Sequence, residues 1–315
     1  MLGHNVLLRL DAEGHEVVAV VRSAGRVKLP HGRWQLIEGQ PTEADTLRHA
    51  AAGCEAIVNC AGVTDMSLTR RDDYEAVNHH LCSTLVDIMQ QTGIKCLVHT
   101  STVNTIGYGN DSHDADESSP MAEPYASSHY AASKAVGEEV VVKAACQHPD
   151  WHTIVINPGF MLGAWDVKPS SGRMLQVAYR RPLMVAPKGG KAFVAVGDVA
   201  TAIVNALTHG VNGQRYIVAG QCMSIRELYR MQARVMGYRQ RMVTLPRWLM
   251  APAGWLGDGL RSCGIHTELS TNNIKQLQVQ EHYDGSRATR ELDVEYTTIE
   301  QAIKDFHQWR EKQKQ

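Results

Sequence analysis

Long apolar runs are missing from this chain of 315 residues. No stretch approaches the roughly 18 consecutive apolar residues of a membrane span. The nearest one, Trp248 to Leu260, contains Pro252 and Gly254, so we expect a buried helix there and no membrane anchor. Asp11 and Glu13 interrupt the apolar run near the amino end, so we expect no secretory leader and a cytoplasmic protein.

An excess of one charge is also missing. The chain has 32 Lys and Arg against 33 Asp and Glu and no basic block, which argues against nucleic acid or an anionic membrane as partners. The seven cysteines form no C-x-x-C pair, as expected of reduced thiols in a cytosol. The histidines show no ligand spacing, and the adjacent His79 and His80 should diverge on a predicted helix. We therefore assign no metal.

Two patterns in the middle of the chain carry the chemistry. An apolar run at 96–98 predicts a short buried strand with the hydroxyl side chains of Thr100 and Thr102 at its carboxyl end. A helix predicted beyond the next Gly- and Asp-rich segment carries Tyr130 and Lys134. Positions four residues apart share one face of a helix, so the phenol and the ammonium can meet over one spot.

Phenol, ammonium and hydroxyl together suit carbonyl chemistry. A phenol with a pKa of about 10 is a poor acid or base at neutral pH, and a fixed cation lowers that pKa. A hydroxyl at the strand end can hold a carbonyl oxygen while the phenol transfers a proton. The Tyr-Lys spacing alone is common by chance. Tyr125 serves as a comparison, because its residue four positions on is His129 and it has no such partner.

These motifs resemble those of the extended short-chain dehydrogenases/reductases, in the NAD(P)-dependent epimerase/dehydratase family and its dihydroflavonol-reductase-like branch. The resemblance covers nearly the whole chain. It implies that Thr102 is the hydroxyl of a catalytic triad, that Tyr130 is the general acid/base, and that Lys134 binds the nicotinamide ribose and lowers the tyrosine pKa. The motifs are Tyr130-x-x-x-Lys134, Thr100-Ser101-Thr102 followed by Gly107, and Asn157-Pro158-Gly159.

The amino end departs from the expected pattern. Residues 5–10 predict an amphipathic helix and 17–21 a strand, whereas a dinucleotide-binding fold should open on a strand and a Gly-rich turn. Relatives carry G-x-x-G-x-x-G there, and Gly3 corresponds to its last glycine. A buried strand with four aliphatic side chains holds roughly 6–12 kcal/mol, against a net domain stability of about 5–15 kcal/mol. We expect the natural protein to start upstream, with Met1 internal; the alternative is a truncated paralogue, which an upstream in-frame stop codon would indicate.

The cofactor should be NADP(H), with NAD(H) as the alternative. Arg22 follows the strand at 17–21 with no nearby acid, and an arginine there favours a 2′-phosphate. A solvated surface arginine is the other interpretation. The resemblance also matches Asn78 to a structural asparagine near the lysine, although a helix-surface asparagine is an alternative. It implies cofactor contacts at Gly3, Ala61, Gly62, Thr100, Tyr130, Lys134, Pro158, Gly159 and Phe160.

The fold we expect is α/β, a doubly wound (Rossmann) parallel sheet with a smaller, mostly helical carboxyl-terminal substrate domain. Residues 1–220 should form the dinucleotide-binding domain, and 221–315 the substrate-binding region, to which 160–192 contributes. Ser224-x-x-Glu227 is a capping box that should open a helix. The polar loop at 164–173 is either a substrate lid, in which Lys168 or Arg173 meets an anionic substrate, or a plain surface loop.

The predicted function is NAD(P)-dependent oxidoreduction of a small-molecule carbonyl or secondary alcohol. Dehydratases of the family carry an Asp-Glu pair directly after the triad hydroxyl, and here Val103-Asn104 stands in its place, which argues against dehydration. Two alternatives stay open: a sugar-nucleotide epimerase with retained NAD, and a catalytically silent cofactor-binding or partner-binding paralogue. Relatives typically form homodimers through two long helices, here 74–91 and the helix of Tyr130; the resemblance allows a homodimer, which the sequence alone does not show.

Overall fold

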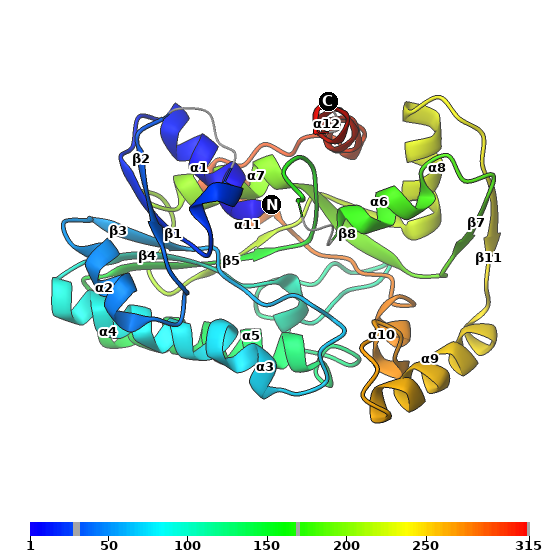
Figure 1. Cartoon of the computed structure of the whole chain (residues 1–315), viewed down its shortest axis with the longest axis horizontal. Helices are drawn as coiled ribbons and strands as arrows, with labels where there is room; N and C mark the ends of the chain where they lie inside the picture. The colour runs from blue at the N-terminus through cyan, green and yellow to red at the C-terminus, as the bar shows by residue number, and fades with distance from the viewer. Residues whose placement is uncertain (28–31, 168–170, 314–315) are drawn as a thin grey trace.

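The computed structural model describes residues 1–27, 32–167 and 171–313 and places a parallel sheet at the centre of the chain (Figure 1). Four strands form its main part in the order β3-β4-β5-β9, all parallel. Their near-continuous apolar sequences fit strands that are buried on both faces. Their bounds are Ala56–Asn59 for β3, Cys96–Thr100 for β4, His152–Pro158 for β5 and Arg215–Val218 for β9.

Helices cover both faces of this sheet, as the doubly wound fold requires (Figure 1). One face packs against α2 (Ala44–Ala51), α4 (Leu81–Thr92) and α5 (His129–Gln147). The other face packs against α1, α7 and α11, and a separate hydrophobic core cluster is buried there. These three helices span Leu2–Ala12, Val196–Asn205 and Ser286–Leu292. The predicted Rossmann architecture is therefore confirmed.

The first two strands of the chain are separate from the four-stranded sheet. The chain opens on α1, and the strands β1 (Val17–Val21) and β2 (Trp34–Glu38) pair only with each other. Within the described ranges, no ladder joins β1 to β3.

The remaining segments build a smaller region beside the sheet (Figure 1). Three strands pair in the order β10-β8-β6, and β11 pairs with β7. The predicted capping box at Ser224 and Glu227 opens α8. The strands are β6 (Phe160–Leu162), β7 (Leu183–Ala186), β8 (Gly190–Ala195), β10 (Gln221–Ser224) and β11 (Arg241–Thr244); the helices are α6 (Gly172–Ala178), α8 (Ile225–Val235), α9 (Arg247–Ser262), α10 (Thr271–Gln276) and α12 (Ile299–Lys312).

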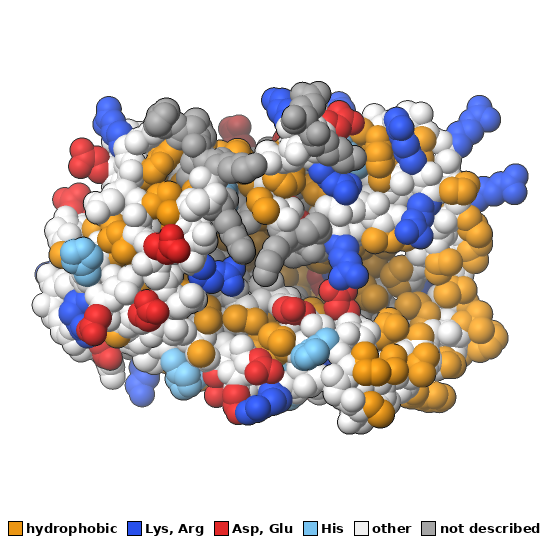
Figure 2. Space-filling view, in the orientation of Figure 1, with side chains coloured by type: hydrophobic (Ala, Val, Ile, Leu, Met, Phe, Trp, Pro, Cys, Tyr) orange, Lys and Arg blue, Asp and Glu red, His pale blue; other side chains and the backbone are white. Residues whose placement is uncertain are grey.

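Helix α9 is not the buried helix expected from its apolar sequence. Trp248 and Trp255 are 72% and 68% exposed, and apolar side chains gather at this end of the molecule in Figure 2. The face that packs inward carries Gly254 and Gly257, against Thr271 and Leu269. Hydrophobicity alone did not show which face packs, because small residues allow the closest approach. No helix in the described part of the chain is long and apolar enough to cross a membrane.

The expectation that His79 and His80 diverge is wrong. Residues 76–80 form a π-helical segment between α3 (Asp72–Glu75) and α4, and the two imidazole rings lie 4.6 Å apart. The wider π-helical turn brings consecutive side chains closer together than an α-helix would. With Glu75 they place three potential ligand atoms within 4.8 Å of one another, a cluster that is partly exposed.

The π-helical segment lies in very close contact with α5, and this contact should not tolerate a side chain. A Cβ added at Gly137 would lie 2.0 Å from the Asn78 carbonyl oxygen. We expect Gly137→Ala to lower the free energy of unfolding by about 1–3 kcal/mol, because the two helices must separate. Gly259→Ala is the matched control, since nothing lies within 4 Å of its added Cβ. That variant should gain about 0.5–1 kcal/mol from helix propensity. Urea unfolding measures both; equal effects would contradict the contact.

Candidate functional site

The predicted triad residues meet where β4 ends beneath the first turns of α5. Thr102 follows the strand and caps a short 3₁₀ turn at Val103–Thr105. Its hydroxyl hydrogen-bonds the hydroxyl of Tyr130. Lys134 is buried and its Nζ donates to the carbonyl oxygen of Thr100 at 2.6 Å. The structure thus brings together three side chains that are up to 32 residues apart in the chain (102 to 134).

Burial shifts the pKa values of both Tyr130 and Lys134. Desolvation raises the pKa of Tyr130, and the hydrogen bond from Thr102 offsets part of that rise. Desolvation likewise lowers the pKa of Lys134. The expected lowering of the tyrosine pKa by Lys134 is therefore not the dominant effect. The ammonium is bonded to the Thr100 carbonyl, and the loss of water around the phenol outweighs it.

A buried polar network fixes the loop that carries Thr102. The Asn157 amide nitrogen donates to the carbonyl oxygen of Thr102 and the hydroxyl of Thr105, both at 3.1 Å, and to the carboxylate of Glu138 at 2.8 Å. Arg215 pairs with the other oxygen of Glu138 at 3.1 Å. Sequence reasoning missed Glu138 and Arg215. An asparagine at the end of an apolar strand was the one signal available for Asn157.

A second buried amide supports the lysine side of the site. The side chain of Asn78 accepts from the Val63 amide at 2.8 Å and donates to the Val63 carbonyl oxygen and the Ser133 hydroxyl, both at 3.0 Å. Asn78 is thus the buried structural residue and not a surface one. A Cβ added at Gly62 would lie 3.6 Å from Lys134 Nζ, so Gly62 lies directly beside the buried ammonium.

Tyr125, which has no lysine four residues on, is paired with a lysine from another element. Lys191 Nζ donates to its hydroxyl oxygen at 2.6 Å, and the hydroxyl bonds the carboxylate of Glu281. This lysine comes from β8, 66 residues away, so helical spacing does not reveal it. Burial, reinforced by Glu281, holds the pKa of Tyr125 well above its usual value.

The residues expected near the nicotinamide lie where β5 ends. Pro158 is its last residue, and a Cβ on Gly159 would lie 2.4 Å from the Ala192 carbonyl oxygen, so only glycine fits there. Phe160 is half-buried and packs edge-on against Phe193, with ring centroids 5.4 Å apart. These positions border the same strand end as Asn157.

The residues expected at the adenosine end follow β1 and β3, which belong to two different sheets. Arg22 is exposed directly after β1. The expectation that no acid lies nearby is wrong in space, because the parallel register sets Glu38 opposite Val21. The Glu38 carboxylate accepts from the backbone amide of Ala24 at 3.2 Å. Ala61, half-buried, follows β3.

Of the two residues expected in a substrate lid, the structure describes Arg173 alone. Arg173 lies on α6, is exposed, and pairs with Glu268 at 2.6 Å. Lys168 lies outside the described residues. The pair joins α6 to the segment between α9 and α10.

The strand ends beside the triad suit the nicotinamide half of a dinucleotide. Within the described ranges, the buried Ser101 hydroxyl has no hydrogen-bond partner, and it sits between Thr100 and Thr102. Lys134 can donate three hydrogen bonds, of which one goes to Thr100. These groups suit a ribose and a carboxamide. No Gly-rich turn between a strand and a helix stands among the described residues to hold a pyrophosphate; Gly3 lies inside α1.

Comparison with known proteins agrees with this geometry. The sequence model of the NAD dependent epimerase/dehydratase family matches residues 1–219. A protein of Synechocystis sp. whose name, dihydroflavonol 4-reductase, is itself provisional is 26% identical and covers 98% of this chain and 91% of its own. Sterol demethylase protein B of Methylococcus capsulatus is also 26% identical, over 98% of this chain and 94% of its own.

Two solved structures share the fold. The crystal structure of gox2253 superposes with a TM-score of 0.83 at 23% identity, covering 99% of this chain and 96% of its own. UDP-glucose 4-epimerase of Thermotoga maritima, solved with UDP-glucose, gives 0.78 at 16% identity, covering 100% and 97%.

Proposed function

The chain belongs to the NAD dependent epimerase/dehydratase family, and we propose that it transfers hydride between NADP(H) and a carbonyl or secondary alcohol of a small molecule. The observation that carries this proposal is the hydrogen bond between Thr102 and Tyr130, with Lys134 buried beside them. That group can bind an oxygen atom and exchange a proton with it. Curated relatives named as a ketoreductase and as sterol dehydrogenases support the choice of reaction class.

Each residue then has a defined task. The cofactor supplies or accepts the hydride. In the reductive direction Tyr130 gives its phenolic proton to the substrate oxygen, while Thr102 donates a hydrogen bond to the same oxygen. In the oxidative direction the Tyr130 phenolate takes that proton back. Lys134 holds ribose hydroxyls, and Asn157 keeps the Thr102 backbone in place.

The proposal includes the pocket and its specificity. Arg22 would bind the 2′-phosphate of NADP(H), with Glu38 the competing acid that would favour NAD(H); parallel titrations with NADPH and NADH test this choice. Residues 221–315 would shape the substrate pocket. Arg261 and Asn273 bond the Met66 carbonyl oxygen at 2.6 and 3.2 Å. The same loop bonds Tyr74, whose ring lies 6.4 Å from that of Tyr130. Dimerisation through α4 and α5 stays a prediction.

Two other functions stay as alternatives. The fold shared with a UDP-glucose 4-epimerase suits an epimerase that keeps NAD bound; release of NAD on denaturing the purified protein would favour it. A catalytically silent cofactor-binding or partner-binding paralogue is the other alternative, and it would show no turnover of any carbonyl or alcohol. The triad of Thr102, Tyr130 and Lys134 favours hydride transfer over a catalytically silent protein. Val103 and Asn104, in place of two carboxylates, argue against dehydration.

Removing the phenolic hydroxyl tests the mechanism. We expect Tyr130→Phe to reduce kcat at least about 100-fold, because no other group delivers the proton, while the Kd for NADPH changes little. Tyr125→Phe is the matched control, since Tyr125 also has a lysine partner but lies in a separate cluster. Steady-state kinetics with ketones, and titration of NADPH fluorescence, measure both quantities. Retention of most of the rate by Tyr130→Phe would rule the mechanism out.

The raised pKa of Tyr130 predicts opposite pH profiles for the two directions. Alcohol oxidation needs the phenolate, so its rate should climb about tenfold per pH unit up to pH 9 or beyond. Carbonyl reduction needs the protonated phenol and should stay flat between about pH 6 and 9. Initial rates in both directions across this range measure the effect. An oxidation rate that levels off near pH 7 would show that the lysine cation, not burial, sets the pKa.

A further inference from the structure

Large apolar side chains that face solvent are concentrated at one end of the molecule. Of the twelve that the described residues expose, nine lie within 183–185 and 243–269. Figure 2 shows apolar side chains gathered at this end, with Lys and Arg side chains projecting next to them. We propose that this α9 surface docks the protein on an anionic lipid bilayer. Its members are Leu183, Val185, Val243, Trp248, Leu249, Trp255, Leu256, Ile265 and Leu269.

Helix α9 turns its apolar side chains to solvent and its small residues inward. Trp248 and Trp255 are two helical turns apart, and so are Leu249 and Leu256, so the four side chains form one exposed stripe. The inward face packs through the two buried glycines of α9. A helix at the surface of a water-soluble protein normally has the reverse arrangement, and a large exposed apolar patch marks an interaction site.

The two-stranded ribbon of β7 and β11 extends this stripe. Its register sets Leu183 opposite Arg241 and Val185 opposite Val243, and paired residues of a ladder share one face of the ribbon. All four are exposed, whereas the methionine of each strand packs inward against a core cluster. Residues 245–246 alone separate β11 from α9, so the ribbon and the helix present one continuous surface.

Positive charge borders the α9 surface. The acids of the same end already have partners: Asp258 accepts hydrogen bonds from the start of α10, and Glu268 pairs with Arg173. The pairing of β7 with β11 brings together basic residues from two distant segments, so no basic block is visible in the sequence. A net charge near zero for the whole chain therefore conceals a basic end. Its exposed basic residues are Arg180, Arg181, Lys188, Arg239 and Arg241.

An anionic bilayer matches both the apolar stripe and the charge. Tryptophan favours the boundary between head groups and acyl chains, and basic side chains bind lipid phosphates. Helix α9 has 16 residues, fewer than the roughly 20 of a membrane span, so it would lie in the plane of the interface. A second copy matches the apolar part alone, because a two-fold contact would bring the two basic sets together.

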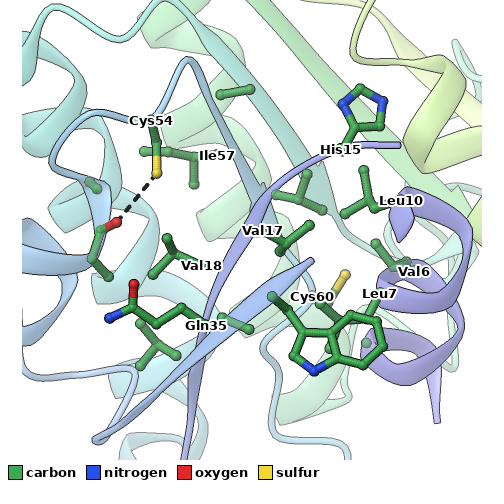
Figure 3. Close-up of a pocket in the computed structure, with 18 of the residues that line it drawn as sticks. Val6, Leu7, Leu10, His15, Val17, Val18, Gln35, Cys54, Ile57 and Cys60 are labelled. Atoms are coloured by element: carbon green, nitrogen blue, oxygen red, sulfur yellow. Dashed lines mark hydrogen bonds between the residues drawn. The ribbon is translucent and has the colours of Figure 1, made fainter. Parts of the chain in front are cut away.

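A cavity at the opposite end of the molecule is the competing place for a lipid chain (Figure 1). It has a volume of about 1320 Å³ and lies between β1 and β3, where Figure 3 shows Val17 and Ile57 among its lining residues. Trp34 also lines this cavity. Acyl chains that carry bromine quench nearby tryptophans, so the tryptophans that are quenched show which of the two places holds the lipid.

Vesicle flotation of the full chain tests the docking. We expect at least about 10-fold more protein to float with vesicles of phosphatidylcholine and phosphatidylglycerol than with phosphatidylcholine alone. The difference should shrink as salt is added. Brominated lipids should quench the tryptophan fluorescence of the protein.

Two pairs of substitutions separate the apolar and the charged contributions. Trp248→Gln with Trp255→Gln should lower vesicle binding at least about 10-fold and remove most of the quenching. Arg181→Gln with Arg241→Gln should lower binding to the anionic vesicles at least about 10-fold and leave binding to phosphatidylcholine unchanged. Since all four side chains are exposed, the melting temperature should stay nearly constant.

The control for the tryptophans is Val211→Gln, at a side chain that is 56% exposed outside the α9 surface. The control for the arginines is Arg48→Gln with Arg70→Gln, two cations on other elements. Both controls should bind vesicles as the unchanged protein does.

Four results would overturn the inference. Without binding to anionic vesicles, an acidic protein would be the better match to the α9 surface. Equal binding to both kinds of vesicle would remove the role of charge. Full quenching in the variant without the two tryptophans would place the lipid at the Trp34 cavity. A dimer that forms without lipid and is lost in that variant, seen by sedimentation, would assign the surface to a second copy.

Discussion

The hydrogen bond from Lys134 Nζ to the Thr100 carbonyl oxygen holds the site together. It ties α5 to the end of β4 and thereby sets the height at which Tyr130 meets Thr102. Because parallel strands end at one edge of the sheet, the ends of β3, β4 and β5 supply the neighbours of that bond. The buried amides of Asn78 and Asn157 then fix the loops on either side. The chemistry depends on this convergence more than on any single side chain.

The triad and Arg22, the residue proposed for the adenosine end, stand on two separate sheets. The triad stands on the four-stranded sheet, whereas Arg22 stands on the separate pair of β1 and β2. In the proposed function, the distance between the nicotinamide and adenosine ends would depend on how the pair of β1 and β2 is held beside the four-stranded sheet.

Local patterns in the sequence predicted much of the fold and the triad. The apolar runs of β4 and β5 and the four-residue spacing of Tyr130 and Lys134 are short-range signals that survive folding. The capping box of α8 is another. Partners from distant segments were beyond such signals: Lys191 reaches Tyr125 from β8, and Glu38 reaches the Arg22 turn through strand register. The π-helical segment that pairs the rings of His79 and His80 likewise follows from tertiary packing against α5. The exposed tryptophans of α9 show that apolar content does not reveal which face is buried.

The most direct test of hydride transfer follows a deuterium label from NADPH to the product. The protein is incubated with NADPH deuterated at C4 of the nicotinamide and, in turn, with a dihydroflavonol, a 3-oxo steroid and UDP-glucose, and the products are examined by NMR. Our account predicts deuterium on the newly formed carbinol carbon of a ketone substrate, in equal amount to the NADPH consumed. Conversion of UDP-glucose to its epimer without exchange of the added label, or no product from any of these compounds, would contradict it.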